Sequence, residues 1–357
     1  MKSDVYFIRI DADNIQQRVH CLKKLLDTVN PFSVYQKNEI IPVKLTVGDS
    51  SCIYNINPEL VKLVVSAIKE NGAKPFLFDT SVIYKGQRQN AIDHLRLIQN
   101  KGFAYSKVGA PFIIADGLFG NDGKEFEIDS QNIKKIKIPS FIGMFDNLIV
   151  LSHVTGHIFT GYAGAVKNIA MGMVCRSTKQ AQHSSLKPKI IEKKCTGCGC
   201  CIAICPAGAI SFNYDKKAFI NQELCIGCGE CICACKFDAV LINWHEDPYV
   251  FCRKLIDVAN FIVSKFKNRF FINFTFDITN ECDCISDKHE KIIMPDIGIL
   301  ASHDILSIEK ATVDLIIKHQ KIHTTSYFNS NKDIYETMLK YASQKGLGNY
   351  EYNLINI

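Results

Sequence analysis

Two cysteine runs in the middle of the chain have the spacing of iron–sulfur ligands. The first, KCTGCGCCIAICPAGAI (194–210), places five cysteines within eleven positions, and the second, LCIGCGECICACKFDAV (224–240), contains five more. Each run includes the pattern Cys-x2-Cys-x2-Cys-x3-Cys. Three thiolates at steps of three residues wrap a tight loop around one four-iron cluster, while the fourth cysteine reaches a second cluster. The runs therefore predict two [4Fe–4S] clusters.

The spacing also predicts that each run completes the cluster of the other. The expected ligands are Cys195, Cys198, Cys201 and Cys235 for cluster 1, and Cys225, Cys228, Cys231 and Cys205 for cluster 2. Zinc is the alternative, because it also binds Cys-x2-Cys pairs. A zinc knuckle, however, gives no reason for a third cysteine at the same step in both runs. We therefore expect the two clusters as cofactors.

Residues 190–245 form an internal repeat that resembles the bacterial ferredoxin domain with two [4Fe–4S] clusters. Each half has a cysteine loop, a short helix and a short strand, AGAI in the first half and DAVL in the second. Pro206 follows the first run as in that domain, whereas Lys236 stands in the place of the second proline. We interpret the additional cysteines Cys200 and Cys233 as small packed side chains, with a redox or ligand role as the alternative.

Composition argues against several classes of protein. The 357 residues are 47% hydrophobic and include 16 cysteines, and the first residues, MKSDVYFIRIDADN, lack the apolar stretch and cleavage pattern expected of a signal peptide. In a cytoplasmic protein, that many cysteines indicate metal ligands rather than disulfides. The formal charge of +6 is spread along the chain, so no nucleic-acid-binding arm is predicted. No apolar stretch is long enough to span a membrane. We expect a soluble, cytoplasmic protein.

On both sides of the cysteine runs, apolar strands alternate with amphipathic helices. The expected strands are 39–47, 74–79, 111–116, 147–152, 269–277 and 296–302, and the expected helices are 13–28, 58–73, 91–103, 247–266 and 304–318. Such alternation predicts an α/β fold with a mostly parallel sheet and helices on both faces. We predict that residues 1–187 and 246–357 form this domain and that residues 188–245 are an inserted ferredoxin-like domain.

Outside the insert, five stretches that span much of residues 40–315 carry a family resemblance: FLFDTSVIYKGQRQNAIDHL, GAPFIIADGL, LSHVTGHIFTGYAGAVKNIAMGM, NFTFDITNECDC and PDIGILAS. In these stretches the sequence resembles the DUF362 family, whose members are often described as iron–sulfur centre proteins of unknown function. The family has a distant likeness to the lactate-racemase type of α/β protein, which we treat as an analogy of fold. The resemblance implies iron–sulfur content and no particular reaction.

Polar residues stand at the ends of several expected strands, where ligands bind in open parallel sheets. Asp79, Asp116 and His153 occupy three of these ends. Lys167 follows in the Gly-rich segment HVTGHIFTGYAGAVKN, which either presents amides to an anion or forms a tight turn. We predict these four residues as catalytic, with His153 as proton donor or metal ligand and Lys167 holding an anionic group.

The segment Cys282-Asp283-Cys284 is a second candidate for metal binding. In an extended backbone both thiols point the same way, which suits a bidentate metal site. Cys175 or a histidine would complete it. The alternative is two packed thiols in a loop.

These features support three functions from different classes. The first is a redox enzyme that passes low-potential electrons through two clusters to a small-molecule substrate in the crevice of the α/β domain. The second is an electron carrier, a ferredoxin with a large docking domain, and the third is a redox or metal sensor. The polar strand ends favour the enzyme. All three require a soluble redox partner, and the absence of a Gly-x-Gly-x-x-Gly motif leaves no reason to predict NAD or flavin.

Overall fold

The structure is a computed structural model that describes most of the chain. The described residues are 2–11, 14–84, 86–183, 187–225, 227, 229–241, 247–284, 291–320 and 327–357. The predicted ligand Cys228 lies outside the described residues.

An eight-stranded, mostly parallel sheet forms the centre of the molecule, in the order β14-β1-β13-β12-β7-β2-β3-β4. Its strands are β1 (Ser3–Arg9), β2 (Ile40–Lys44), β3 (Lys74–Asp79), β4 (Phe112–Ile114), β7 (Asn147–His153), β12 (Asn268–Thr275), β13 (Gly298–Ser302) and β14 (Tyr352–Asn356). Only β13 runs against its two neighbours, β1 and β12. The other described pairs within this sheet are parallel.

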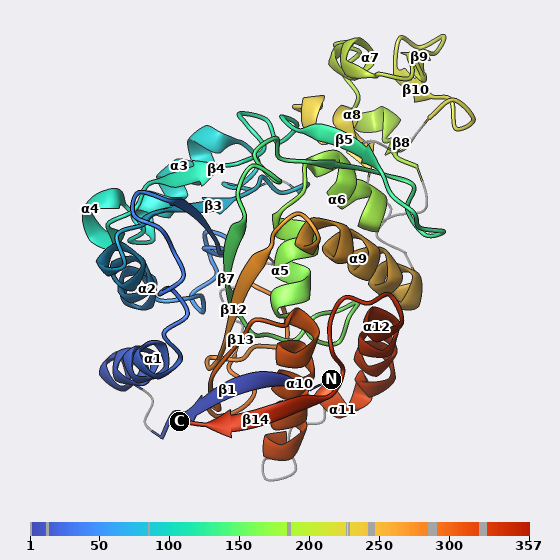
Figure 1. Cartoon of the computed structure of the whole chain (residues 1–357). Coiled ribbons are helices and arrows are strands. Elements are labelled where there is room, and N and C mark those ends of the chain that lie inside the picture. Colours follow the sequence, from blue (N-terminus) through green and yellow to red (C-terminus); the bar gives the residue numbers. More distant parts are fainter. Residues whose placement is uncertain are drawn as a thin grey trace.

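Helices cover both faces of the sheet, as Figure 1 shows. The strands alternate accordingly: Leu148 and Val150 of β7 pack into one core, and Ile149 and Leu151 pack into the other. The helices of the first face are α5 (Ala165–Gly172), α9 (Pro248–Val263), α10 (Ile305–Gln320) and α12 (Lys332–Gln344), and those of the second are α1 (Ile15–Val29), α2 (Pro58–Glu70), α3 (Ala91–Asn100) and α4 (Tyr105–Val108). This arrangement confirms the predicted fold class. Of the helices in the described part of the chain, none has the length and apolar character needed to cross a membrane.

The two strands at one edge of the sheet were not predicted from the sequence. β14 is an edge strand that pairs only with β1, and its sequence YNLIN has no apolar run because most of its residues are exposed. Four predicted strands are shorter than expected: β2 ends at Lys44, β4 has three residues, β12 ends at Thr275 and β13 begins at Gly298. At the carboxyl ends of β2, β4 and β12, the chain leaves the sheet earlier than predicted and continues as a loop.

The cysteine-rich segment projects from one end of the α/β body (Figure 1) and has a small core of its own. Its elements are β8 (Lys189–Ile190), a 3-10 turn (Glu192–Lys194), α7 (Cys200–Ile204), β9 (Ile210–Phe212), β10 (Ala218–Ile220), α8 (Glu230–Ala234) and β11 (Val240–Leu241). β8 and β11 pair antiparallel, so the chain enters and leaves the segment side by side. The predicted domain boundaries at 188 and 245 remain a prediction.

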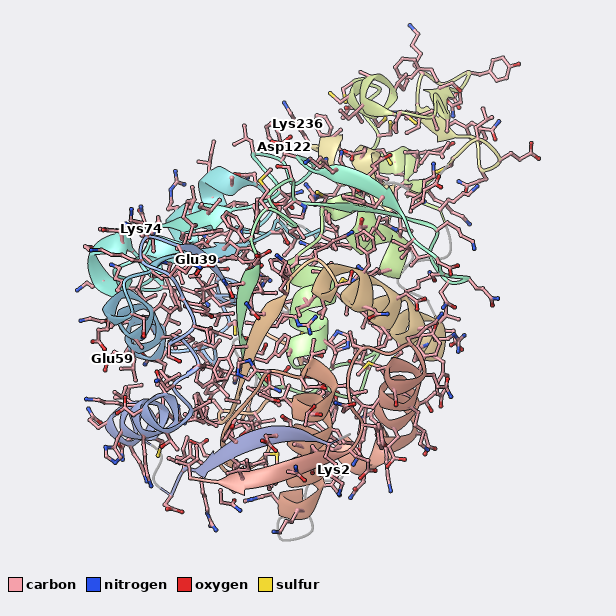
Figure 2. All side chains as sticks on the ribbon, viewed as in Figure 1. Lys2, Glu39, Glu59, Lys74, Asp122 and Lys236 are labelled. Carbon is pink, nitrogen blue, oxygen red and sulfur yellow. A yellow bond between two sulfur atoms is a disulfide. The ribbon has the colours of Figure 1, made fainter. Side chains whose placement is uncertain are left out.

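The segment is joined to the body through side chains as well as through the chain itself. Asn121 donates a hydrogen bond to Glu230 at the start of α8. Figure 2 shows Asp122 and Lys236 labelled in this region, where the loop after β4 approaches the cysteine-rich segment. A short antiparallel pair, β5 (Lys124–Glu127) and β6 (Lys135–Ile138), follows that loop.

Candidate functional site

Cysteines from both runs line a first cavity in the cysteine-rich segment. About 330 Å³ of space, including its open mouth, lies between the predicted cluster 1 ligands Cys195, Cys198, Cys201 and Cys235. Burial raises the pKa of the Cys201 thiol, and the nearby thiols of Cys195, Cys235 and Cys198 raise it further. Three cysteines of the first run and one of the second therefore share one site.

A second cavity of about 310 Å³, again including its mouth, lies between cysteines of the opposite combination. Cys205 of the first run lies here, together with Cys225 and Cys231 of the second. The crossed arrangement of these thiols is what the spacing predicts for two four-iron clusters.

Backbone amides around both cavities donate hydrogen bonds to the cysteine sulfurs. The amide of Ala218 lies 3.3 Å from Cys195 Sγ, that of Ala209 lies 3.3 Å from Cys205 Sγ, and that of Ala239 lies 3.2 Å from Cys235 Sγ. Such amides stabilise negative charge on thiolates and on cluster sulfurs. The donors present thus fit [4Fe–4S] clusters, which would be held by these thiolates and would supply one-electron transfer at low potential.

The α/β body contains a larger polar cavity at the carboxyl ends of β2, β3 and β7. Counting its open mouth, it holds about 800 Å³. About half of its lining residues are charged residues, histidines or cysteines: Lys44, Asp79, Arg88, His153, His157, Lys167, Lys179, His183, Cys282, Asp283 and Cys284. Three of the four residues predicted as catalytic meet here, and Asp116 does not.

Asp79 lies at the centre of a buried group of charges on the β2–β3 side of the cavity. Its carboxylate is 3.1 Å from Lys44 Nζ and 3.6 Å from an Arg88 nitrogen. Burial works against ionisation, but Lys44, His94 and Arg88 outweigh it and hold the pKa of Asp79 below its usual value. Lys44 also donates to Asn168 Oδ1 at 2.6 Å. Asp79 is thus a fixed carboxylate that orients cations, rather than an available proton donor.

A second buried lysine approaches the cavity from α6 (Arg176–His183). Lys179 donates to Thr80 Oγ1 at 2.6 Å and to the carbonyl oxygen of Ser81. Burial lowers the pKa of Lys179 to about 8, with Asp116 and Asp79 opposing the change. Asp116 accepts hydrogen bonds from the Ser81 amide at 2.9 and 3.0 Å, so it supports the turn that holds Lys179.

His153, at the end of β7, has both ring nitrogens occupied. Nδ1 lies 2.8 Å from Asp283 Oδ1, and Nε2 lies 2.9 Å from the carbonyl oxygen of Phe276. Because a carbonyl only accepts and a carboxylate accepts when ionised, both nitrogens carry a proton. Burial opposes this charge, but Asp283 outweighs it and raises the pKa of His153. With both ring nitrogens in these contacts, His153 positions Asp283, and its role as proton donor or metal ligand stays a prediction.

Lys167, on α5, faces the two cysteines that flank Asp283. Its Nζ lies 2.8 Å from Cys282 Sγ and 3.2 Å from Cys284 Sγ. Burial lowers the pKa of Lys167 to about 7, although Asp283 opposes this. The two cysteines are joined to each other by a disulfide.

The predicted three-cysteine metal site is not assembled in this structure. Cys175 is buried and its thiol approaches the carbonyl oxygen of Asp122 at 3.6 Å, away from the polar cavity. Cys282 and Cys284 are joined by a disulfide, so their sulfurs are not arranged with Cys175 around a single metal ion in this structure.

Glu309 of α10 fixes the start of the helix that carries Lys167. Its Oε1 accepts hydrogen bonds from the Ala165 amide at 2.7 Å and from Tyr162 Oη at 3.1 Å. Burial raises the pKa of Glu309 to about 7, despite these hydrogen bonds. The folded state therefore binds the Glu309 proton more tightly than the unfolded chain does.

This shift predicts a pH-dependent effect of Glu309→Gln. A carboxyl whose folded-state pKa is raised contributes stability that is complete below its unfolded pKa and is lost as the pH rises through 7. Between about pH 5 and about pH 8, the wild type should therefore lose up to about 3 kcal/mol relative to Glu309→Gln. Urea unfolding of both proteins at the two pH values measures this. An identical pH dependence would contradict it.

One helix, α6, borders both the second cysteine cavity and the polar cavity. Gly229, at the edge of the cysteine cavity, packs so closely on α6 that a Cβ at this position would lie 2.9 Å from Cβ of Gln180. Lys179 and His183 of the same helix line the polar cavity. Helix α6 thus contacts the edge of the second cysteine cavity through Gln180 and lines the polar cavity through Lys179 and His183.

Lys44 is a charged wall residue that sequence reasoning missed. A signal was available, because Lys44 is the only charged residue within the apolar stretch IIPVKLTV (40–47). A lysine in a buried strand needs a partner. Its partners Asp79 and Asn168 come from β3 and α5, distant in the chain.

Comparison with known proteins identifies the family of this chain. Residues 41–314 match the family described as "Domain of unknown function (DUF362)". The chain belongs to the DUF362 family. This confirms the resemblance to DUF362 that the sequence showed, while the resemblance of residues 190–245 to a ferredoxin domain stays a prediction. No curated protein matches the chain.

Two solved structures are similar to this DUF362 protein. One is a structural-genomics protein from Thermotoga maritima, with 11% sequence identity and a TM-score of 0.44, over 94% of this chain and 60% of that one. The other is the lactate racemase apoprotein from Thermoanaerobacterium thermosaccharolyticum, with 13% identity and a TM-score of 0.38, over 89% of this chain and 56% of that one. The DUF362 chain therefore spans less than two thirds of the length of either.

Proposed function

We propose that this DUF362 protein is an iron–sulfur redox protein that passes electrons from two [4Fe–4S] clusters to a small molecule bound in the polar cavity. The main support for this proposal is the position of α6, which borders both kinds of site. The helix contacts the edge of the second cysteine cavity through Gln180 and lines the polar cavity through Lys179 and His183. Electrons leaving the second cysteine cavity would therefore enter the polar cavity after crossing one helix.

The chemistry of the ligands supports a separate binding site for the substrate. A cluster held by four thiolates has no vacant coordination position, so a substrate must bind to other groups of the protein. The polar cavity provides such groups. Lys167 is half-buried at its wall, and Lys179 donates to neutral oxygens of Thr80 and Ser81 behind it, whereas Lys44 is paired with Asp79. Burying cations is costly unless they are used or paired, and a simple electron carrier has no need of them.

The electron donor in this proposal is a soluble one-electron protein. Cys198, at the first cysteine cavity, is exposed. A donor can therefore approach that cavity from solution, while the second cavity adjoins the body through Gly229.

Cluster content is the first test of the proposal. Anaerobically prepared protein is expected to contain about 8 iron and about 8 labile sulfide per chain, because each set of four thiolates completes one four-iron cluster. Colorimetric iron and sulfide assays with quantitative amino-acid analysis measure this. A variant with both Cys225→Ala and Cys231→Ala is the control and should retain about half of each. Two zinc ions without sulfide would refute the proposal.

A further inference from the structure

One wall of the polar cavity consists of two sulfur atoms and a lysine. Cys282 and Cys284 are separated by one residue and are joined by a disulfide. Lys167 Nζ lies 2.8 and 3.2 Å from the two sulfurs. All three side chains line the cavity. The disulfide is therefore in contact with the site where the proposed function places the substrate.

The segment that carries the two sulfurs is fixed from three directions. Asp283, between the cysteines, accepts a hydrogen bond from His153 at 2.8 Å through its side chain and one from the Asp49 amide at 3.0 Å through its carbonyl oxygen. Lys167 approaches from α5. The sulfurs are thus held against the cavity whether or not the bond between them is formed.

The two cysteines differ in access. Cys282 is buried, with 3% of its surface exposed, and it is the sulfur closer to Lys167. Cys284 is half-buried. An ammonium group beside a sulfur stabilises the thiolate, which is the reactive form in thiol–disulfide chemistry. Cys284 is therefore the more accessible sulfur, and Cys282 is the buried sulfur beside the ammonium group of Lys167.

We propose that Cys282 and Cys284 form a redox-active disulfide–dithiol centre in the polar cavity and that Lys167 stabilises its thiolate. Reduction breaks the S–S bond, consumes two electrons and one proton, and leaves a thiol at one cysteine and a thiolate paired with Lys167 at the other. The source of electrons rests on the proposed function: two reduced [4Fe–4S] clusters hold one electron each, which together supply the two required. The dithiol centre would thus store two electrons that the clusters deliver one at a time.

An electron count tests this inference. The oxidised holoprotein is titrated anaerobically with a photoreduced deazaflavin in the presence of catalytic ferredoxin. Wild-type protein should take up about four electrons per chain, two for the clusters and two for the disulfide. The double variant Cys282→Ser, Cys284→Ser should take up about two. A second double variant, Cys175→Ser, Cys252→Ser, replaces buried cysteines outside the cavity and should resemble the wild type.

Alkylation of the reduced protein tests the role of Lys167. Iodoacetamide should label Cys284 and Cys282 only after reduction, as measured by mass spectrometry of the peptide that contains both. Lys167→Met should slow this labelling about tenfold, because the ammonium no longer stabilises the thiolate. Lys167→Arg should restore most of the rate. Lys101→Met is the matched control, since Lys101 donates to backbone carbonyls outside the cavity.

The outcomes separate this inference from the proposed function. Uptake of about two electrons by wild type and variant alike would overturn the dithiol centre and leave the clusters intact. Uptake of none would instead refute the proposed function itself. A zinc or iron ion that is bound to the pair and lost in Cys282→Ser, Cys284→Ser would also overturn the dithiol centre, in favour of a metal site. An unchanged rate of labelling in Lys167→Met would show that Lys167 does not stabilise the thiolate of the dithiol centre.

Discussion

Replacing Cys205 with alanine is expected to destroy the cluster held by Cys225, Cys228 and Cys231, although Cys205 belongs to the other run. The structure places Cys205 in the second cysteine cavity with Cys225 and Cys231, and places Cys235 in the first. A four-iron cluster that loses one thiolate becomes labile, so iron content should fall from about 8 to about 4 per chain.

Anaerobic alkylation identifies which cluster has been lost. In Cys205→Ala, the thiols of Cys225 and Cys231 should become reactive toward iodoacetamide, because no cluster protects them. Cys195 and Cys201, which line the first cavity, should remain protected. Mass spectrometry of the labelled peptides distinguishes the two sets.

Cys200→Ala provides the matched control for this experiment. Cys200 lies in the same run as Cys205 and borders the first cavity, but it is not one of the predicted ligands. This variant should retain about 8 iron and full protection of the other cysteines. Labelling of Cys195 and Cys201 in Cys205→Ala, with Cys225 still protected, would show that each run binds its own cluster.

The cysteine pattern could be read from the sequence because its geometry is local. Steps of three residues place three thiols on one loop, and a cysteine four residues later faces the other way across a short helix. The sheet could be read for a related reason: buried parallel strands are continuous apolar runs, such as NLIVLS in β7. β14 lacked that signal, because an exposed edge strand needs no apolar run.

The candidate site was predictable in part. Parallel strands place their carboxyl ends at one edge of the sheet, which brought Asp79 and His153 to one cavity, and Lys167 joins them from α5, the helix that follows β7 in the chain. Asp116 does not line the cavity, because β4 ends two residues before it and the chain then turns. The Asp116 carboxylate accepts a hydrogen bond from the Ser81 amide behind the cavity instead. The pairing of His153 with Asp283 joins residues 130 positions apart, and no local pattern encodes it.

Replacing Lys167 or His153 with alanine is expected to abolish reaction in the polar cavity while leaving both clusters intact. Neither side chain lines a cysteine cavity. Loss of Lys167 removes the half-buried cation that faces the sulfurs, and loss of His153 releases the carboxylate of Asp283 that holds Cys282 and Cys284 in place. Iron content should stay at about 8 and the cluster potentials should remain nearly unchanged, because the thiolate ligands and their amide donors are untouched.

The reaction is measured as reoxidation of the reduced clusters by the small-molecule fraction of an anaerobic cell extract. Wild-type clusters should be reoxidised, and in Lys167→Ala and His153→Ala the rate should fall at least about a hundredfold, as expected when a positioning or charge-bearing group is lost. Lys101→Ala, which alters a lysine outside the cavity, should keep the wild-type rate. Full activity in both cavity variants would instead favour an electron carrier, since a carrier delivers electrons through its surface and makes no use of Lys167 or His153.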